Sequence, residues 1–104
     1  MANEILVIGG GISGLACAWR LRRGGHDVLL LEGKPEAGGN IRTEQHNGFR
    51  IECGPHTFMG SADDIFTLAE EVGLSTQLVP TRPSAKKRFI VRRGRMHEVP
   101  LGPW

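Results

Sequence analysis

Two short apolar runs, with a glycine-rich stretch and a helical pattern between them, dominate the first third of the chain. Ile5–Ile8 and Val28–Leu31 contain only apolar residues, which is typical of strands buried on both faces of a parallel sheet. Between them, Ser13–Arg23 repeats its apolar residues at the spacing of a helix with one apolar face. Strand, helix and strand within about 30 residues predict one βαβ unit, so we expect an α/β fold.

The rest of the chain predicts two β-hairpins. His46-Asn47-Gly48 lies between the strand-like runs Thr43–Gln45 and Phe49–Ile51, and Asn-Gly in that position is a strong signal for a tight turn. Lys87–Val91 and Met96–Val99 form a second pair of strand-like runs, separated by four residues that include a glycine.

A second helix is predicted between the two hairpins. Its apolar residues recur at i, i+3, i+4 and i+7 and give one stripe, which consists of Ile65, Leu68, Ala69 and Val72. Ser61 followed by Asp64 resembles a capping box at the start of this helix, with Asp in place of the usual Glu. Gly73 is placed to end the helix. We expect this helix to connect parts of the fold and to carry no chemistry.

Three glycines directly after the first apolar run have the spacing G-x-G-x-x-G. Gly9 allows a tight turn out of the strand, Gly11 allows a pyrophosphate to approach the backbone, and Gly14 allows the helix to pack on the strand. A helix that begins at Ser13 would offer free N–H groups and a partial positive charge to a diphosphate. The alternative is a tight turn without a ligand, which the other features of the unit disfavour.

The acid that ends the second apolar run extends this prediction to the ribose. Glu32 lies 18 residues after Gly14, close to the spacing of about 20 expected for an acid that accepts from ribose hydroxyls. Its carboxylate favours a free 2′-hydroxyl and repels a 2′-phosphate. A second glycine pair, Gly38-Gly39, follows six residues later and suggests a further contact with an extended cofactor, which favours FAD over NAD.

Charge is distributed unevenly along the chain, although the net charge is only +2. Residues 1–81 carry six Lys/Arg and ten Asp/Glu, and residues 82–104 carry seven Lys/Arg and one Asp/Glu. A basic tail can indicate nucleic acid or an anionic membrane. These basic residues are interleaved with Phe89, Ile90 and Val91 in a strand-like pattern, so we favour a hairpin with a solvated basic face and expect no nucleic-acid partner.

Other candidate chemistry in the chain is sparse. Cys17 and Cys53 do not form a C-x-x-C pair, and we expect two buried free thiols. Four scattered histidines lack metal-ligand spacing, so we expect no metal site. His56 favours packing or hydrogen bonding over catalysis, Ser13 lacks an accompanying base, and the catalytic residues stay unassigned. No apolar run reaches 18 residues, so we expect no transmembrane segment.

Five segments together resemble a known family. The runs VIGGGISGLACAWRL, LLLE and GGNIRT resemble the FAD-binding segments of amine-oxidase-like flavoproteins, and GFRIECGPHTF and KRFIVRRGRMHEVP resemble the N-terminal part of the protoporphyrinogen oxidase family. The resemblance covers nearly the whole chain. Asn40 departs from the arginine common in the wider superfamily, which favours protoporphyrinogen oxidases over amine oxidases. His56-Thr57 replaces the Asn-Ser usual in the narrower family, a departure that bears on the substrate.

The resemblance implies an FAD-dependent oxidoreductase that removes six electrons from protoporphyrinogen IX to form protoporphyrin IX in haem biosynthesis, with FAD reoxidised by oxygen. It also implies which residues contact FAD. These are Gly9, Gly11, Ile12, Ser13 and Gly14 at the diphosphate, Glu32 at the ribose, Gly38, Gly39 and Arg42 along the ribityl-to-diphosphate region, and Gly54 and Pro55 towards the flavin.

Members of this family run to several hundred residues. We therefore expect residues 1–104 to be the N-terminal part of a Rossmann-like FAD-binding domain, incomplete at its C-terminal end and inactive alone. The porphyrinogen substrate would belong to the full-length protein, located in the cytoplasm or, as an alternative, peripherally at a membrane. An exposed sheet edge would favour self-association. Two other readings stay open: a freestanding, non-catalytic dinucleotide-binding module, or another amine-oxidase-like flavoprotein.

Overall fold

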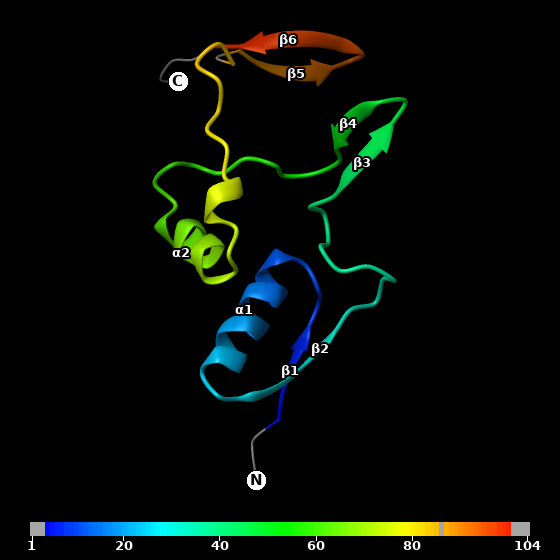
Figure 1. The fold of residues 1–104 in the computed structure, drawn as a ribbon. Helices are drawn as coiled ribbons and strands as arrows, with labels where there is room; N and C mark the ends of the chain where they lie inside the picture. Colours follow the sequence, from blue (N-terminus) through cyan, green and yellow to red (C-terminus); the bar gives the residue numbers. More distant parts are fainter. Residues whose placement is uncertain (1–3, 86, 101–104) are drawn as a thin grey trace.

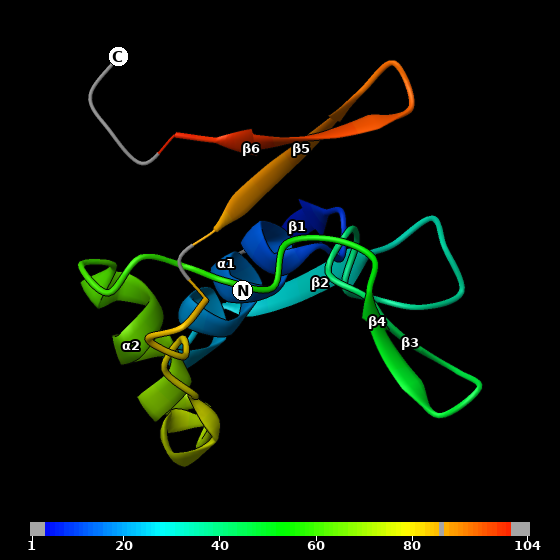
Figure 2. The ribbon, with the colours of Figure 1, turned by 90° about the horizontal axis from the view of Figure 1, so that it is seen from above.

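The computed structural model describes residues 4–85 and 87–100, which form three two-stranded sheets and two α-helices (Figure 1). The chain extends over 58 × 34 × 29 Å, and its radius of gyration is 18.0 Å. A compact domain of about 100 residues has a radius of gyration of about 13 Å, so this chain is much more open than a closed domain. Both hairpins project away from the first sheet and its helix (Figures 1 and 2).

The first sheet and its helix form the predicted βαβ arrangement. Strand β1 (Glu4–Ile8) pairs in parallel with β2 (Asp27–Leu31), and Ile5 lies opposite Val28 in the register. Helix α1 (Ile12–Arg23) connects the two strands and contacts both of them. The expected parallel strand pair and mixed α/β composition are therefore confirmed.

The expectation that both faces of these strands are buried is wrong. Helix α1 covers one face, and the side chains on that face are partly exposed at Ile5, Val7, Val28 and Leu30. The opposite face carries an apolar stripe, which we call the open face, and Ile8 on it is 80% exposed. The open face consists of Leu6, Ile8, Leu29 and Leu31. An uncovered apolar face of this kind needs a second layer of structure to bury it.

Both predicted hairpins are present. Strands β3 (Thr43–His46) and β4 (Phe49–Glu52) pair antiparallel, and Asn47 and Gly48 between them both have positive φ, as a type I′ turn requires. Strands β5 (Arg88–Arg92) and β6 (Arg95–Val99) form the second hairpin. Its turn has only two central residues, because each strand extends one residue further into the expected four-residue connection.

Helix α2 (Asp63–Glu71) is followed by a short 3₁₀ turn, Ser75–Gln77. The predicted capping box is wrong, because the N-cap residue is Ala62 and makes no side-chain cap hydrogen bond. The two acids Asp63 and Asp64 instead stand in the first turn, where the helix dipole favours negative charge. The predicted end at Gly73 is confirmed: its N–H donates to Glu70 O over 3.1 Å.

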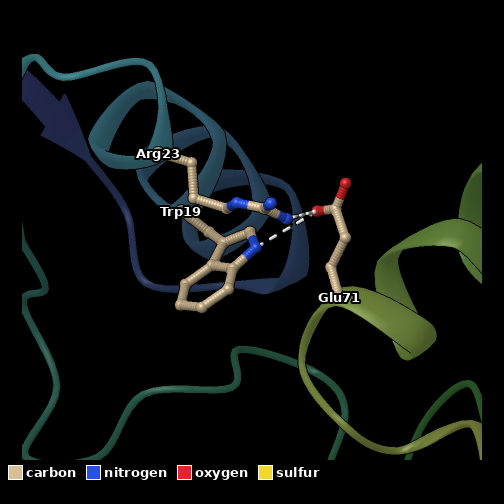
Figure 3. A network of polar contacts seen from close by, with 3 residues as sticks. All are labelled: Trp19, Arg23 and Glu71. Atoms are coloured by element: carbon tan, nitrogen blue, oxygen red, sulfur yellow. Dashed lines mark hydrogen bonds and ion pairs between the residues drawn. The ribbon is translucent and has the colours of Figure 1, made fainter.

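A polar cluster formed by Trp19, Arg23 and Glu71 joins helices α1 and α2 (Figure 3). Trp19 Nε1–H donates to Glu71 Oε2 over 3.2 Å, and Arg23 Nη1 lies 3.6 Å from the same oxygen. Among the described residues, Ala69 on α2 is the only buried apolar residue, at 8% exposed. The elements are thus joined mainly by local pairing and polar contacts, and not by a shared apolar core.

A glycine in the left-handed region ends α1 and starts the return to β2. Gly25 has φ +84°, its N–H donates to Arg22 O over 3.0 Å, and the next N–H, of His26, donates to Leu21 O over 3.1 Å. These two bonds are those of a Schellman motif.

We expect Gly25→Ala to lower the free energy of unfolding by roughly 1 to 2 kcal/mol, since an L side chain is strained at this φ. Urea unfolding followed by far-UV circular dichroism measures the change. The matched control is Gly33→Ala, which lies in the same unit, has no left-handed φ and would meet no atom within 4 Å. Equal unfolding free energies for the two variants would contradict the assignment.

Candidate dinucleotide-binding site

The loop between β1 and α1 places an open helix N-terminus at the end of the parallel strands. Gly9 N–H donates to Leu31 O over 2.7 Å and so continues the strand pairing into the loop. Gly11 is the N-cap of α1, and Leu15 N–H donates to its carbonyl over 2.9 Å. The N–H groups that precede Leu15 in the first turn therefore have no acceptor within the helix.

The charges along α1 favour an anion at this end. Its first turn contains no acidic residue, and its last turn carries Arg20, Arg22 and Arg23. The positive end of the helix dipole is therefore not neutralised by a side chain of the helix itself. Free N–H groups and a positive dipole end together stabilise a bound phosphate.

Gly14 allows the helix to lie directly on the loop. A Cβ atom at this position would overlap the carbonyl oxygen of Gly9 and would lie 3.7 Å from Val7 Cγ1. The backbone of α1 therefore packs against the end of β1 without a side chain between them. This agrees with the role in helix packing expected from the glycine spacing.

A second glycine segment returns to the loop and forms the other wall of the site. Gly38 N–H donates to Gly10 O over 2.8 Å, and Gly38 forms an isolated parallel bridge with Gly11. A Cβ atom at Gly39 would lie only 3.1 Å from Gly11 Cα. Residues about 30 positions apart in the chain thus contact each other through backbone atoms alone. Glycine permits so close an approach because it has no side chain.

These two walls flank an open hollow of about 520 Å³, within the size range of ligand pockets. Eight of the predicted cofactor residues line it: Gly9, Gly11, Ile12, Ser13, Gly14, Gly38, Gly39 and Pro55. Three further lining residues were not predicted from the sequence: Ile8, Asn40 and Ile41. The sequence signal for all three was their place beside the glycines, because Ile8 directly precedes the first glycine run, and Asn40 and Ile41 directly follow the glycine pair.

Glu32 lies next to the glycine loop, held there by two backbone hydrogen bonds. Its Oε1 accepts from Lys34 N–H over 2.8 Å, and its Oε2 accepts from Gly10 N–H over 2.6 Å. These bonds, that of Lys34 first and then that of Gly10, hold the pKa of the Glu32 carboxyl below its ordinary value of 4.5. The side chain therefore stands ionised beside the loop at neutral pH, as a group that accepts from ribose hydroxyls requires.

Three predicted residues, Glu32, Arg42 and Gly54, do not line this hollow, although Glu32 lies beside the loop. Arg42 Nη2 lies 2.7 Å from Glu44 Oε1 in an exposed ion pair, and Arg42 lines a separate, smaller hollow with the loop residues from Lys34 onwards. Gly54 instead packs against the backbone of Asn40. Asn40 and Pro55, which lie close to Arg42 and Gly54 in the sequence, do line the hollow.

The remaining candidate groups are dispersed. Cys17 and Cys53 are free, but both are exposed, so the expected burial is wrong. His56 Nδ1 lies 3.4 Å from Gly54 O, a local contact whose direction depends on the tautomer. Within residues 4–85 and 87–100, no group of three or more His, Cys, Asp or Glu side chains could hold a metal ion. Over the same residues, neither helix has the length and apolar character needed to cross a membrane.

Comparison with known proteins connects this geometry to a family. The profile of the flavin-containing amine oxidoreductases matches residues 12–103. The chain belongs to this family. The expected flavin cofactor is therefore confirmed, and so is the expected assignment to an FAD-dependent class of oxidoreductases.

Within this family, the chain is similar to proteins named as porphyrinogen oxidases. The chain is 39% identical, over 99% of its length and 20% of the relative's, to a chloroplastic protoporphyrinogen oxidase of Oryza sativa subsp. japonica. It is 35% identical, over 95% of its length and 19% of the relative's, to a coproporphyrinogen III oxidase of Propionibacterium freudenreichii subsp. freudenreichii. The expected resemblance to protoporphyrinogen oxidases is confirmed.

A solved structure agrees with both the sequence match and the fold. A protein from Exiguobacterium sp. 255-15, assigned as a protoporphyrinogen oxidase, superposes with a TM-score of 0.74 and 31% identity over 100% of this chain and 23% of that protein. A putrescine oxidase variant superposes with a TM-score of 0.63 and 30% identity over 67% of this chain and 16% of that protein. The chain spans about a fifth of the length of the curated relatives it matches.

We expect the Glu32 carboxyl to titrate with a midpoint below 4.5, because backbone N–H donors stabilise its charged form. The stability that this group contributes is fully present above its ordinary pKa and is lost as the pH falls through the lowered value. The amide resonances of Gly10 and Lys34 report the titration by NMR. Glu32→Gln should remove the transition from both amides, whereas a wild-type midpoint at or above 4.5 would refute the two-bond arrangement.

Proposed function

We propose that this chain forms the half of an FAD site that holds the adenosine and the diphosphate, as the opening part of a Rossmann-like FAD-binding domain. The observation that carries the proposal is the hollow between the N-terminus of α1 and the Gly38-Gly39 segment, with an ionised carboxylate beside it. Backbone N–H groups, close glycine contacts and a ribose-accepting acid are the donor and acceptor set that an adenine dinucleotide needs. The residues fit the cofactor.

Each predicted residue has a proposed role in that site. The loop and first turn of α1 would bind the diphosphate, through Gly9, Gly11, Ile12, Ser13 and Gly14. Glu32 would accept from the adenosine ribose. Gly38 and Gly39 would face the diphosphate and ribityl chain, and Arg42 would join them by exchanging its Glu44 partner for a phosphate. Gly54 and Pro55 would lead towards the flavin.

FAD, when bound, supplies the redox chemistry of such enzymes, and the protein supplies binding and orientation. For the full-length protein we propose oxidation of a porphyrinogen, with protoporphyrinogen IX as the substrate. Coproporphyrinogen III is the second candidate, because relatives named for each reaction resemble the chain to a similar degree. Residues 1–104 would not turn over alone, since they contain no assigned catalytic residue and only one part of the cofactor site.

We further propose that residues 1–104 are incomplete as a domain. The open face of β1 and β2, with Ile8 80% exposed, is suited to a covering layer that other parts of a longer protein would supply. The unpaired edges of this two-stranded sheet would also favour association between copies. We propose a cytoplasmic location, with peripheral membrane contact as the alternative for the full-length protein. A freestanding binding module is the second candidate for the chain itself.

The proposed site is tested by comparing its affinity for a nucleotide with a free ribose 2′-hydroxyl and for one with a 2′-phosphate. We expect ADP to shift the amide resonances of residues 9–14 and 38–39 in a labelled sample, and 2′-phospho-ADP to bind several-fold more weakly because Glu32 repels the added phosphate. Glu32→Gln should reduce this discrimination. Shifts confined to other residues, or equal affinities for the two nucleotides in the wild-type chain, would overturn the proposal.

A further inference from the structure

One close backbone approach lies just outside the hollow, at Gly54. A Cβ atom at this position would overlap the carbonyl oxygen of Asn40, would lie 2.8 Å from Asn40 C and would lie 3.6 Å from Ile41 N. All three neighbours are backbone atoms, so rotation of a flexible side chain cannot relieve the overlap. Gly54 does not line the hollow, whereas Asn40 does.

The β3–β4 hairpin brings Gly54 to this position. The pairing of Thr43 with Glu52 ends the ladder of the two strands, and one more bond follows it, from Cys53 N–H to Arg42 O over 2.8 Å. One residue beyond that bond, at Gly54 and Asn40, the two backbone segments pack against each other without a side chain between them. The base of the hairpin therefore fixes the backbone of the segment that leads out of the glycine pair.

The opposite side of the same segment contacts the loop of the βαβ unit. Gly38 N–H donates to Gly10 O over 2.8 Å, and Gly39 lies so close to Gly11 that an added Cβ would be 3.1 Å from its Cα. Ile41 N–H donates to Gly38 O over 3.1 Å and closes a turn around the pair. The segment from Gly38 to Asn40 is thus held between the phosphate-binding loop on one side and Gly54 on the other.

We propose that Gly54 is a positioning residue, which holds Asn40 and thereby the Gly38-Gly39 wall at its distance from the loop. This inference rests on the proposed function for its ligand, and it assigns Gly54 an action through Asn40 in place of direct contact with the flavin. A side chain at residue 54 would displace the Asn40 carbonyl and move the wall. The ribose side of the site, at Glu32, would keep its geometry, because its bonds are made by Gly10 and Lys34.

The test compares Gly54→Ala with Gly60→Ala, since a Cβ at Gly60 would meet no atom within 4 Å and its φ is not left-handed. Without ligand, Gly54→Ala should shift the Gly38 and Gly39 amides and speed hydrogen exchange at Gly38 at least tenfold. With ligand, it should lower the affinity for FAD several-fold and leave that for AMP nearly unchanged. Gly60→Ala should change none of these quantities.

The outcomes separate this inference from the proposed function. Unchanged exchange at Gly38 together with an unchanged ratio of FAD to AMP affinity would overturn the role of Gly54. Equal losses for FAD and AMP, with the Gly10 and Lys34 amides displaced as well, would mean that the variant disrupts the whole unit and would also overturn it. If neither nucleotide binds the wild-type chain, the proposed function fails, while exchange at Gly38 still decides whether Gly54 positions the wall.

Discussion

The contacts of backbone on backbone at three glycines hold the candidate site together. Gly14 lets α1 lie on the loop after β1, Gly39 lets the returning chain lie on Gly11, and Gly54 lets the base of the β3–β4 hairpin lie on Asn40. The contacts at Gly39 and Gly54 join residues 28 and 14 positions apart in sequence, whereas the contact at Gly14 joins α1 to the loop directly before it. A Cβ atom at any of the three would lie 3.1 Å or less from a backbone atom. Because only one apolar residue among those described is buried, these contacts, with the local hydrogen bonds, define the shape of the hollow.

The local elements followed from the sequence because their signals are local. Apolar runs, helical spacing and Asn47-Gly48 predicted the parallel pair, the helices and the hairpins, since each pattern reports on neighbouring residues. The capping box at Ser61 is wrong because the N-cap is Ala62, one residue later, and a cap depends on where the first turn forms. The glycine spacing and Glu32 predicted one wall of the site and its acid.

Features that depend on distant contacts did not follow from the sequence. The apolar runs predicted strands buried on both faces, but burial depends on what covers them, and Leu6 and Ile8 are exposed. The resemblance implies a place for Gly54 towards the flavin, whereas its contact with Asn40 arises only when the hairpin folds back.

Retention of FAD by the isolated chain tests the central claim, that it holds the adenosine and diphosphate but not the flavin ring. The chain would be purified with excess FAD and desalted, and its visible spectrum and bound stoichiometry recorded beside solution affinities for FAD and ADP. The account predicts a colourless protein that binds FAD and ADP with affinities within a few-fold of each other. Retention of about one FAD per chain would contradict it, because residues 1–104 would then form a self-sufficient flavin site.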